Sequence, residues 1–155
     1  MENIEQLLME HPFLAGMDPR LIKLLAGCST NVVFKAGEFI LREGGDADKF
    51  YFIRSGKVVV EVFIPPKGAL VIRTRTAGEI FGWSWMVPPY KWHFDARAAE
   101  LTRAVAVDGA CLREKCEKDH DLGYELMKRF ARIIAERLEA TRMQLLDIYG
   151  GNAKK

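Results

Sequence analysis

Residues 36–58 read AGEFILREGGDADKFYFIRSGKV and decide the fold of this chain. Two short apolar runs, 39–41 and 50–53, lie on either side of a loop that contains Gly44, Gly45 and two aspartates. Gly56 follows the second run and begins another turn. Short apolar runs bounded by glycine and aspartate are typical of β-strands joined by tight turns. The stretch therefore predicts a series of antiparallel strands.

The same pattern continues on both sides of this stretch. Further apolar runs stand at 32–34, 58–64, 70–76, 80–81 and 104–107, with turns at 35–37, 54–57 and 65–68. Because no helical spacer separates the runs, they disfavour a parallel βαβ sheet and favour an antiparallel sandwich or barrel. We predict a jelly-roll barrel, or double-stranded β-helix, over residues 31–108.

Two short helices are predicted before the barrel. Leucines and isoleucines spaced three and four apart indicate helices at 4–9 and 19–27. Asp18 can cap the second helix, and Pro19 suits its first turn because a first-turn residue needs no N–H partner.

Helices are also predicted after the barrel. Asp108 can cap a short helix, and Asp119 or Asp121 can cap a long one that ends at Gly150-Gly151. The chain is then one mainly β domain with flanking α-helices, divided into a helical segment 1–30, the barrel 31–108, C-terminal helices 109–149 and a tail 150–155.

The long helix carries two apolar faces. Leu122, Leu126, Phe130 and Ile133 form the first. The second has the alternating spacing of four and three that marks a coiled-coil seam: Met127, Ala131, Ile134, Leu138, Thr141, Leu145 and Ile148. A helix packed only on its own domain would also explain the pattern, but ~27 residues make a helix of ~40 Å, longer than such a domain. We predict a homodimer through residues 121–149, and we interpret the balanced charges of this segment as a solvated face.

Composition excludes several classes of function. The 155 residues include 23 basic and 21 acidic side chains, a formal charge of +2 that indicates no attraction to nucleic acid or membrane. No leader peptide and no run near ~18 apolar residues is present, so we expect a soluble cytoplasmic protein. Cys28, Cys111 and Cys116 form no C-x-x-C pair and predict thiols rather than a disulfide framework or zinc site, although the last two leave redox sensing open.

Residues 78–98 hold all three tryptophans of the chain. A short strand at 77–82 leads into residues 83–87, which can form one helical turn. Pro88-Pro89 ends that turn because proline supplies no N–H. Aromatic residues at 90–94 then precede strand-like sequence at 95–98. Such a mixture of strand, turn and rings indicates a built site rather than a simple connection.

Residues 36–58 resemble the first half of a cyclic nucleotide-binding domain, the sensor of the catabolite activator protein family, of protein kinase A regulatory subunits and of cyclic nucleotide-gated channels. The resemblance covers almost the whole chain. It implies a regulatory, non-catalytic module of a bacterial type, in which the long C-terminal helix forms the dimer interface.

In that family a phosphate-binding cassette resembling G-E-[LI]-[GA]-L is followed by R-[ST]-A, and its Glu and Arg bind the ribose and the cyclic phosphate. Here residues 82–86 read GWSWM, which puts Trp83 at the Glu position. Counting back from Ala98, the R-[ST]-A positions hold Trp92, His93 and Phe94. Sliding the register to Glu79 fails because Pro89 then stands where Arg is needed. The usual contacts to cAMP or cGMP are therefore missing, and whether Arg97 reaches the pocket stays open.

Two readings of this stretch follow. In the first, the pocket is rebuilt for a different small molecule, with candidate ligand-binding residues Gly82, Trp83, Ser84, Trp85, Tyr90, Lys91, Trp92, His93 and Phe94. In the second, the rings plug the pocket and leave a dimeric structural or protein-interaction module. Weak cyclic nucleotide binding through the backbone N–H groups of residues 82–84 is a third possibility.

Other functions find little support in the sequence. His11, His93 and His120 show no metal-ligand spacing, and Ser84 lacks the second glycine of a nucleophile elbow. We therefore expect no enzyme activity, no metal and no cofactor. The chain ends soon after the long helix, so we expect no direct DNA binding and an output through a partner protein or the dimer.

Overall fold

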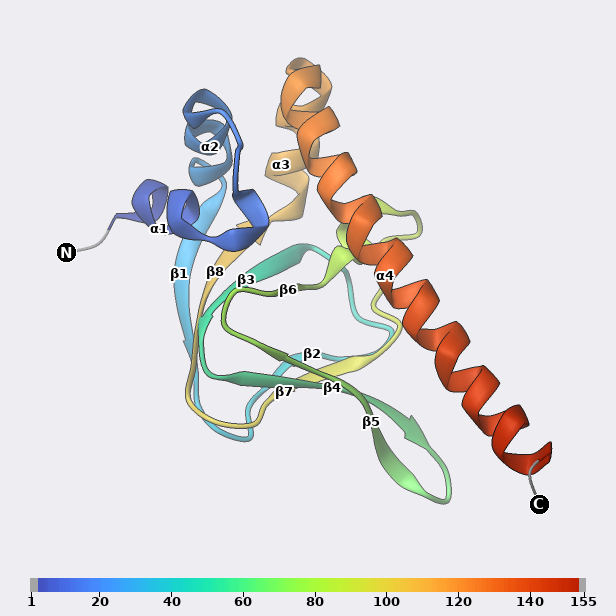
Figure 1. Cartoon of the computed structure of the whole chain (residues 1–155). Helices are drawn as coiled ribbons and strands as arrows, with labels where there is room; N and C mark the ends of the chain where they lie inside the picture. The colour runs from blue at the N-terminus through green and yellow to red at the C-terminus, as the bar shows by residue number, and fades with distance from the viewer. Residues whose placement is uncertain (1–2, 154–155) are drawn as a thin grey trace.

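The predicted strands form two four-stranded antiparallel sheets in the computed structural model, which describes residues 3–153 (Figure 1). One sheet has the order β1-β8-β3-β6 and the other β2-β7-β4-β5. The strands are β1 (Ser29–Phe34), β2 (Phe39–Leu41), β3 (Lys49–Ser55), β4 (Lys57–Ile64), β5 (Gly68–Thr76), β6 (Ile80–Phe81), β7 (Asp95–Ala98) and β8 (Thr102–Asp108). The predicted fold class is confirmed, although the two sheets do not close into one continuous barrel.

The space between the sheets is lined by alternate residues of each strand, as the period of a strand requires. On β4, Val58 and Val60 are buried there. Small side chains also line this space, Ala96 on β7 of the same sheet and Ala104 and Ala106 on β8 of the other sheet. Because alanine leaves volume unfilled, this interior has room for large rings from elsewhere in the chain.

Most of the helices gather at one end of the sheets, and the last and longest helix runs from that end along the side of the sheets (Figure 1). They are α1 (Ile4–Glu10), η1 (Pro12–Leu14), α2 (Pro19–Ala26), η2 (Trp83–Met86), α3 (Gly109–Lys118) and α4 (His120–Ala153). The predicted caps are confirmed at Asp18, which accepts from the N–H of Arg20, and at Asp108, which accepts from the N–H of Cys111. Of the two aspartates proposed for the long helix, Asp119 accepts from an N–H of its first turn.

Helix α4 is longer than predicted, because it continues through Gly150 to Ala153. Glycine costs a helix about 1 kcal/mol relative to alanine but does not forbid the helical conformation. The first half of α4 buries Leu122, Leu126 and Phe130, whereas its second half projects away from the sheets (Figure 1). Within residues 3–153 no helix is long and apolar enough to cross a membrane.

A disulfide joins Cys28 to Cys111, with Cα atoms 5.7 Å apart. The prediction of free thiols is therefore wrong for these two residues. The pairing of β1 with β8 explains the bridge. Ser29 at the start of β1 is opposite Val107 near the end of β8, so the residue that precedes β1 and the residues that follow β8 are neighbours. Cys116 is a free, half-buried thiol.

Replacing Cys28 and Cys111 together by serine is expected to lower the free energy of unfolding by about 2–4 kcal/mol, because the bridge closes a long loop in the unfolded chain. Urea denaturation of oxidised protein measures the change. Cys116→Ser is the matched control and is expected to unfold at the wild-type midpoint. A double variant as stable as the wild type would contradict the bridge.

Candidate ligand site

Gly82 sets the geometry of the cassette, residues 78–98. Its φ of +93° lies in the left-handed region, which a side chain disfavours, and it directs the chain from β6 into η2. A Cβ atom at this position would also lie 3.1 Å from the ring of Trp92. The absence of a side chain at Gly82 therefore lets the indole of Trp92 approach the backbone closely.

The rings of Trp92 and Phe94 fill part of the space between the sheets, where they are only 5% and 8% exposed. Trp92 is held through its backbone, since its N–H donates to the carbonyl of Gly45 and its carbonyl accepts from the N–H of Gly44, each at 2.9 Å. Trp92 and Phe94 stand at the positions predicted to match the Arg and the Ala of the family cassette. Their rings belong to the hydrophobic interior.

A cavity of about 300 Å³, here named the α4 cavity, remains between these rings, β5 and α4. Trp83 forms one wall, and its indole Nε1 is buried without a hydrogen-bond partner among residues 3–153. The lining residues are Val60, Ile72, Arg73, Trp83, Phe94, Ile134, Arg137, Leu138 and Thr141. The cavity is mainly apolar, with a few polar groups at one end, as ligand sites in proteins commonly are.

Arg137 is the most perturbed charge at this site. Its Nε and Nη2 atoms are buried and have no hydrogen-bond partner in the described part of the chain. Burial, together with repulsion from Arg75 and Arg73, lowers the pKa of Arg137 to about 10. Arg73 donates to the hydroxyl of Thr141 at 3.3 Å, which links β5 to α4 beside the cavity. The buried positive charge of Arg137 would be stabilised by an anion beside it.

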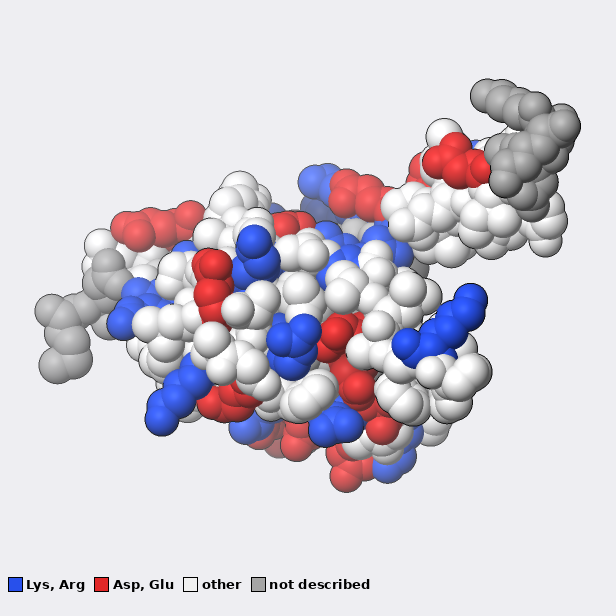
Figure 2. Space-filling model, turned by 90° about the horizontal axis from the view of Figure 1, so that it is seen from below, with Lys and Arg blue, Asp and Glu red and all other residues white. Residues whose placement is uncertain are grey.

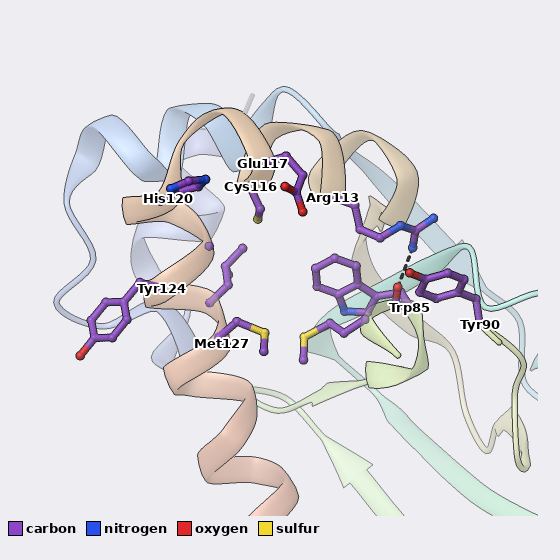
Figure 3. A pocket seen from close by; sticks show the side chains of 11 residues that line it. Trp85, Tyr90, Arg113, Cys116, Glu117, His120, Tyr124 and Met127 are labelled. Atoms are coloured by element: carbon purple, nitrogen blue, oxygen red, sulfur yellow. Dashed lines mark hydrogen bonds between the residues drawn. The ribbon is translucent and has the colours of Figure 1, made fainter. Parts of the chain in front are cut away.

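A second cavity, of about 380 Å³, lies at the corner between α3, α4 and the cassette (Figure 3). Trp85 and Tyr90 line it, together with Arg113. The guanidinium of Arg113 lies 4.3 Å from the centre of the Tyr90 ring and donates to the carbonyl of Trp85 at 2.5 Å. These contacts engage the guanidinium of Arg113, whereas Nε1 of Trp85 at the same cavity is buried without a hydrogen-bond partner in residues 3–153.

The other predicted site residues lie elsewhere. Ser84 is buried, and its hydroxyl has no partner within residues 3–153. Lys91 forms an exposed ion pair with Asp46, and His93 is exposed. The nine candidates are thus divided between two cavities, the interior and the surface, and only Trp83 and Phe94 meet at the α4 cavity.

Whether Arg97 reaches the pocket is decided by the residue with which it is paired. Its Nε donates to the carboxylate of Glu61 at 3.0 Å across β7 and β4, and this hydrogen bond raises the pKa of Arg97. Glu61 is buried. Arg97 is therefore engaged in the sheet and does not line the α4 cavity.

Most of the α4 cavity was not found from the sequence, which missed these lining residues as ligand-site candidates: Val60, Ile72, Arg73, Ile134, Arg137, Leu138 and Thr141. A signal was present, since Arg137 stands inside the apolar stripe that runs from Ile134 to Thr141. The interpretation of the helix charges as a solvated face is wrong for this residue, because its guanidinium is buried.

Comparison with known proteins gives the family. A profile described as "Cyclic nucleotide-binding domain" matches residues 31–119, more than half of the chain. This chain belongs to the cyclic nucleotide-binding domain family. The resemblance seen in residues 36–58 is thereby confirmed.

Individual relatives match between half and nearly all of this chain. A crystal structure of a Geobacter metallireducens protein assigned to the cyclic nucleotide-binding proteins is 30% identical, with a TM-score of 0.78 over 89% of this chain and 99% of that one. A CRP-like cAMP-activated global transcriptional regulator of Mycobacterium tuberculosis is 25% identical over 94% of this chain. The cAMP-dependent protein kinase regulatory subunit of Schizosaccharomyces pombe is 36% identical over 50% of this chain. This chain spans 63% of the length of the Mycobacterium regulator and 18% of the kinase subunit.

Trp92→Arg, which restores the residue type of the family cassette, is expected to destabilise the domain by about 3 kcal/mol or more, because it removes a buried ring and places a charge in an apolar interior. Thermal unfolding measures the effect. The adjacent exposed residue supplies the control, His93→Arg, which is expected to change stability by about 0.5 kcal/mol or less. Equal melting temperatures for the two variants would show that Trp92 is not part of the interior.

Proposed function

We propose that this chain is a non-catalytic regulatory module that binds a small-molecule ligand in the α4 cavity. The observation that carries the proposal is the set of buried polar atoms around that cavity, Nε1 of Trp83 and Nε and Nη2 of Arg137, none with a partner in the described residues. An unsatisfied buried donor costs about 1–3 kcal/mol. A ligand that accepts these hydrogen bonds would recover that free energy on binding.

The ligand is proposed to differ from a cyclic nucleotide. The relatives named for cAMP belong to the same family, but Trp83 and Trp92 stand where the family cassette supplies Glu and Arg. Neither indole can accept a hydroxyl proton, and neither carries a charge for a phosphate. We therefore assign recognition of the ligand to side chains of β5 and α4 rather than to side chains of the cassette.

The alternative is a plugged domain that acts as a structural or protein-interaction dimer. The burial of Trp92 and Phe94 favours it, since their rings occupy part of the interior. The open α4 cavity favours the ligand-binding proposal instead. The ligand-binding proposal and the plugged alternative predict different results in one experiment: only the first predicts that a small molecule stabilises the folded protein.

Helix α4 is proposed to form the homodimer and to transmit the signal. Its projecting half exposes large apolar side chains, namely Leu138, Met143, Leu145, Leu146, Ile148 and Tyr149. Figure 2 shows the same end of the helix standing clear of the body with a mostly uncharged surface. Such a surface is typical of a helix that pairs with another helix.

The proposal is tested by thermal shift with a panel of metabolites that includes cAMP and cGMP. A ligand at 100 times its Kd adds about 2.7 kcal/mol of stability, so binding raises the melting temperature. We expect at least one metabolite other than a cyclic nucleotide to stabilise the wild type and the control Gln144→Trp, but not Thr141→Trp, whose indole would fill the α4 cavity. If no compound in the panel stabilises the wild type, the plugged alternative is favoured.

The dimer is tested by light scattering coupled to gel filtration. Leu145→Glu combined with Ile148→Glu is expected to give a monomer, because like charges would face each other across an apolar seam. Gln144→Glu adds a charge on the same helix outside the seam and is expected to leave the dimer intact. A wild type that is monomeric at tens of micromolar would contradict the dimer.

A further inference from the structure

A cavity of about 560 Å³ adjoins the α4 cavity, and Arg73 and Arg137 line both. Arg75 lines the larger cavity as well, so three guanidinium groups gather where the two spaces meet. The carboxylates on this wall are those of Glu79 and Glu136. Positive charge is therefore in excess at the junction.

The pairing of β5 with β4 explains how two of these arginines come to face inward. Arg73 is opposite Val60 and Arg75 is opposite Val58 in this antiparallel pair. Directly opposite residues place their side chains on the same face of a sheet, and both valines are buried between the sheets. Arg73 and Arg75 thus project from the inner face of β5, toward α4 and Arg137.

The hydrogen bonds at this point leave part of the positive charge unpaired. Arg75 donates to Glu79 at 2.8 Å through Nη1, but its Nε is buried and has no partner within residues 3–153. Burial opposes ionisation of Glu79, yet hydrogen bonds from Thr76 and Arg75 hold its pKa below the usual range, so it stays a carboxylate. Glu79 is thus already engaged with Arg75, whereas the buried nitrogens of Arg137 have no partner in the same residues.

Buried guanidinium groups that repel one another are costly unless an anion lies among them. Arginine also binds phosphate and carboxylate groups in a bidentate way, through two parallel N–H donors. Because Glu79 is paired with Arg75, the groups best placed to take such an anion are Arg73 and Arg137, and their charge exceeds that of the remaining carboxylate, Glu136. Trp83 and Phe94 line the α4 cavity together with Arg73 and Arg137, so apolar rings and positive charges share one space.

We propose that the ligand carries an anionic group, such as a phosphate monoester, bound among Arg73, Arg75 and Arg137, and an aromatic or apolar body that lies against Trp83 and Phe94. This inference rests on the proposed function, because it assigns the ligand class of the same cavity. The anionic end of the ligand then meets β5 and α4 rather than the cassette, where Trp92 occupies the position of the family arginine.

The test is isothermal titration of the full chain with three probes: 1-naphthyl phosphate, neutral 1-naphthol and inorganic phosphate. We expect 1-naphthyl phosphate to bind at least about tenfold more tightly than either other probe, a difference of about 1.4 kcal/mol. Arg137→Met and Arg75→Met are expected to remove this advantage. The exposed arginine of the same helix gives the matched control, Arg132→Met, which is expected to retain it.

Thermal unfolding without a ligand is the second measurement. Arg137→Met is expected to melt at or above the wild-type temperature, because it removes a buried charge that has no partner within residues 3–153. If instead it melts lower and dissociates a dimer, the guanidinium is paired by a second copy of the chain and the anion proposal is overturned.

The remaining outcomes separate this inference from the proposed function. If 1-naphthol binds as tightly as 1-naphthyl phosphate and Thr141→Trp blocks both, the cavity binds ligands but the anion proposal is overturned. If no probe binds, the anion proposal is overturned too, and the metabolite panel decides whether the proposed function survives.

Discussion

The packing of Phe130 against three other rings is the interaction on which the rest of the structure depends. Phe130 is fully buried, and its ring centre lies 5.2 Å from that of Phe13, 5.3 Å from Phe50 and 5.7 Å from Trp85. One side chain of α4 therefore contacts the N-terminal segment, β3 and η2 together. This contact sets the direction in which α4 leaves the domain, and two helical turns later it brings Arg137 over β5.

A second constraint is the filling of the interior by rings of the cassette. Alanines on β7 and β8 leave room between the sheets, and Trp92 and Phe94 occupy it. The open space is thereby displaced toward α4, where the available polar groups come from β5 and the helix.

The sequence predicted the elements of this fold because their signals are local. Glycine turns and short apolar runs predicted the strands, and Asp18 and Asp108 were assigned as caps from residue type and position alone. The cassette also predicted Trp83 and Phe94 as candidate ligand contacts, although their meeting in one cavity depends on distant elements. The Cys28–Cys111 bridge was missed because nothing in the spacing of the cysteines reveals that β1 pairs with β8.

By itself, therefore, the sequence determined the family and the antiparallel β class, and it predicted that rings replace the usual cassette residues. Only the tertiary structure decided which charges are buried. Arg73, Arg75 and Arg137 look like ordinary surface arginines in sequence, because a solvated and a buried guanidinium have the same local pattern. The lowered pKa of Arg137, and its two buried nitrogens that lack a partner among the described residues, arise only when β5 and α4 come together over one cavity.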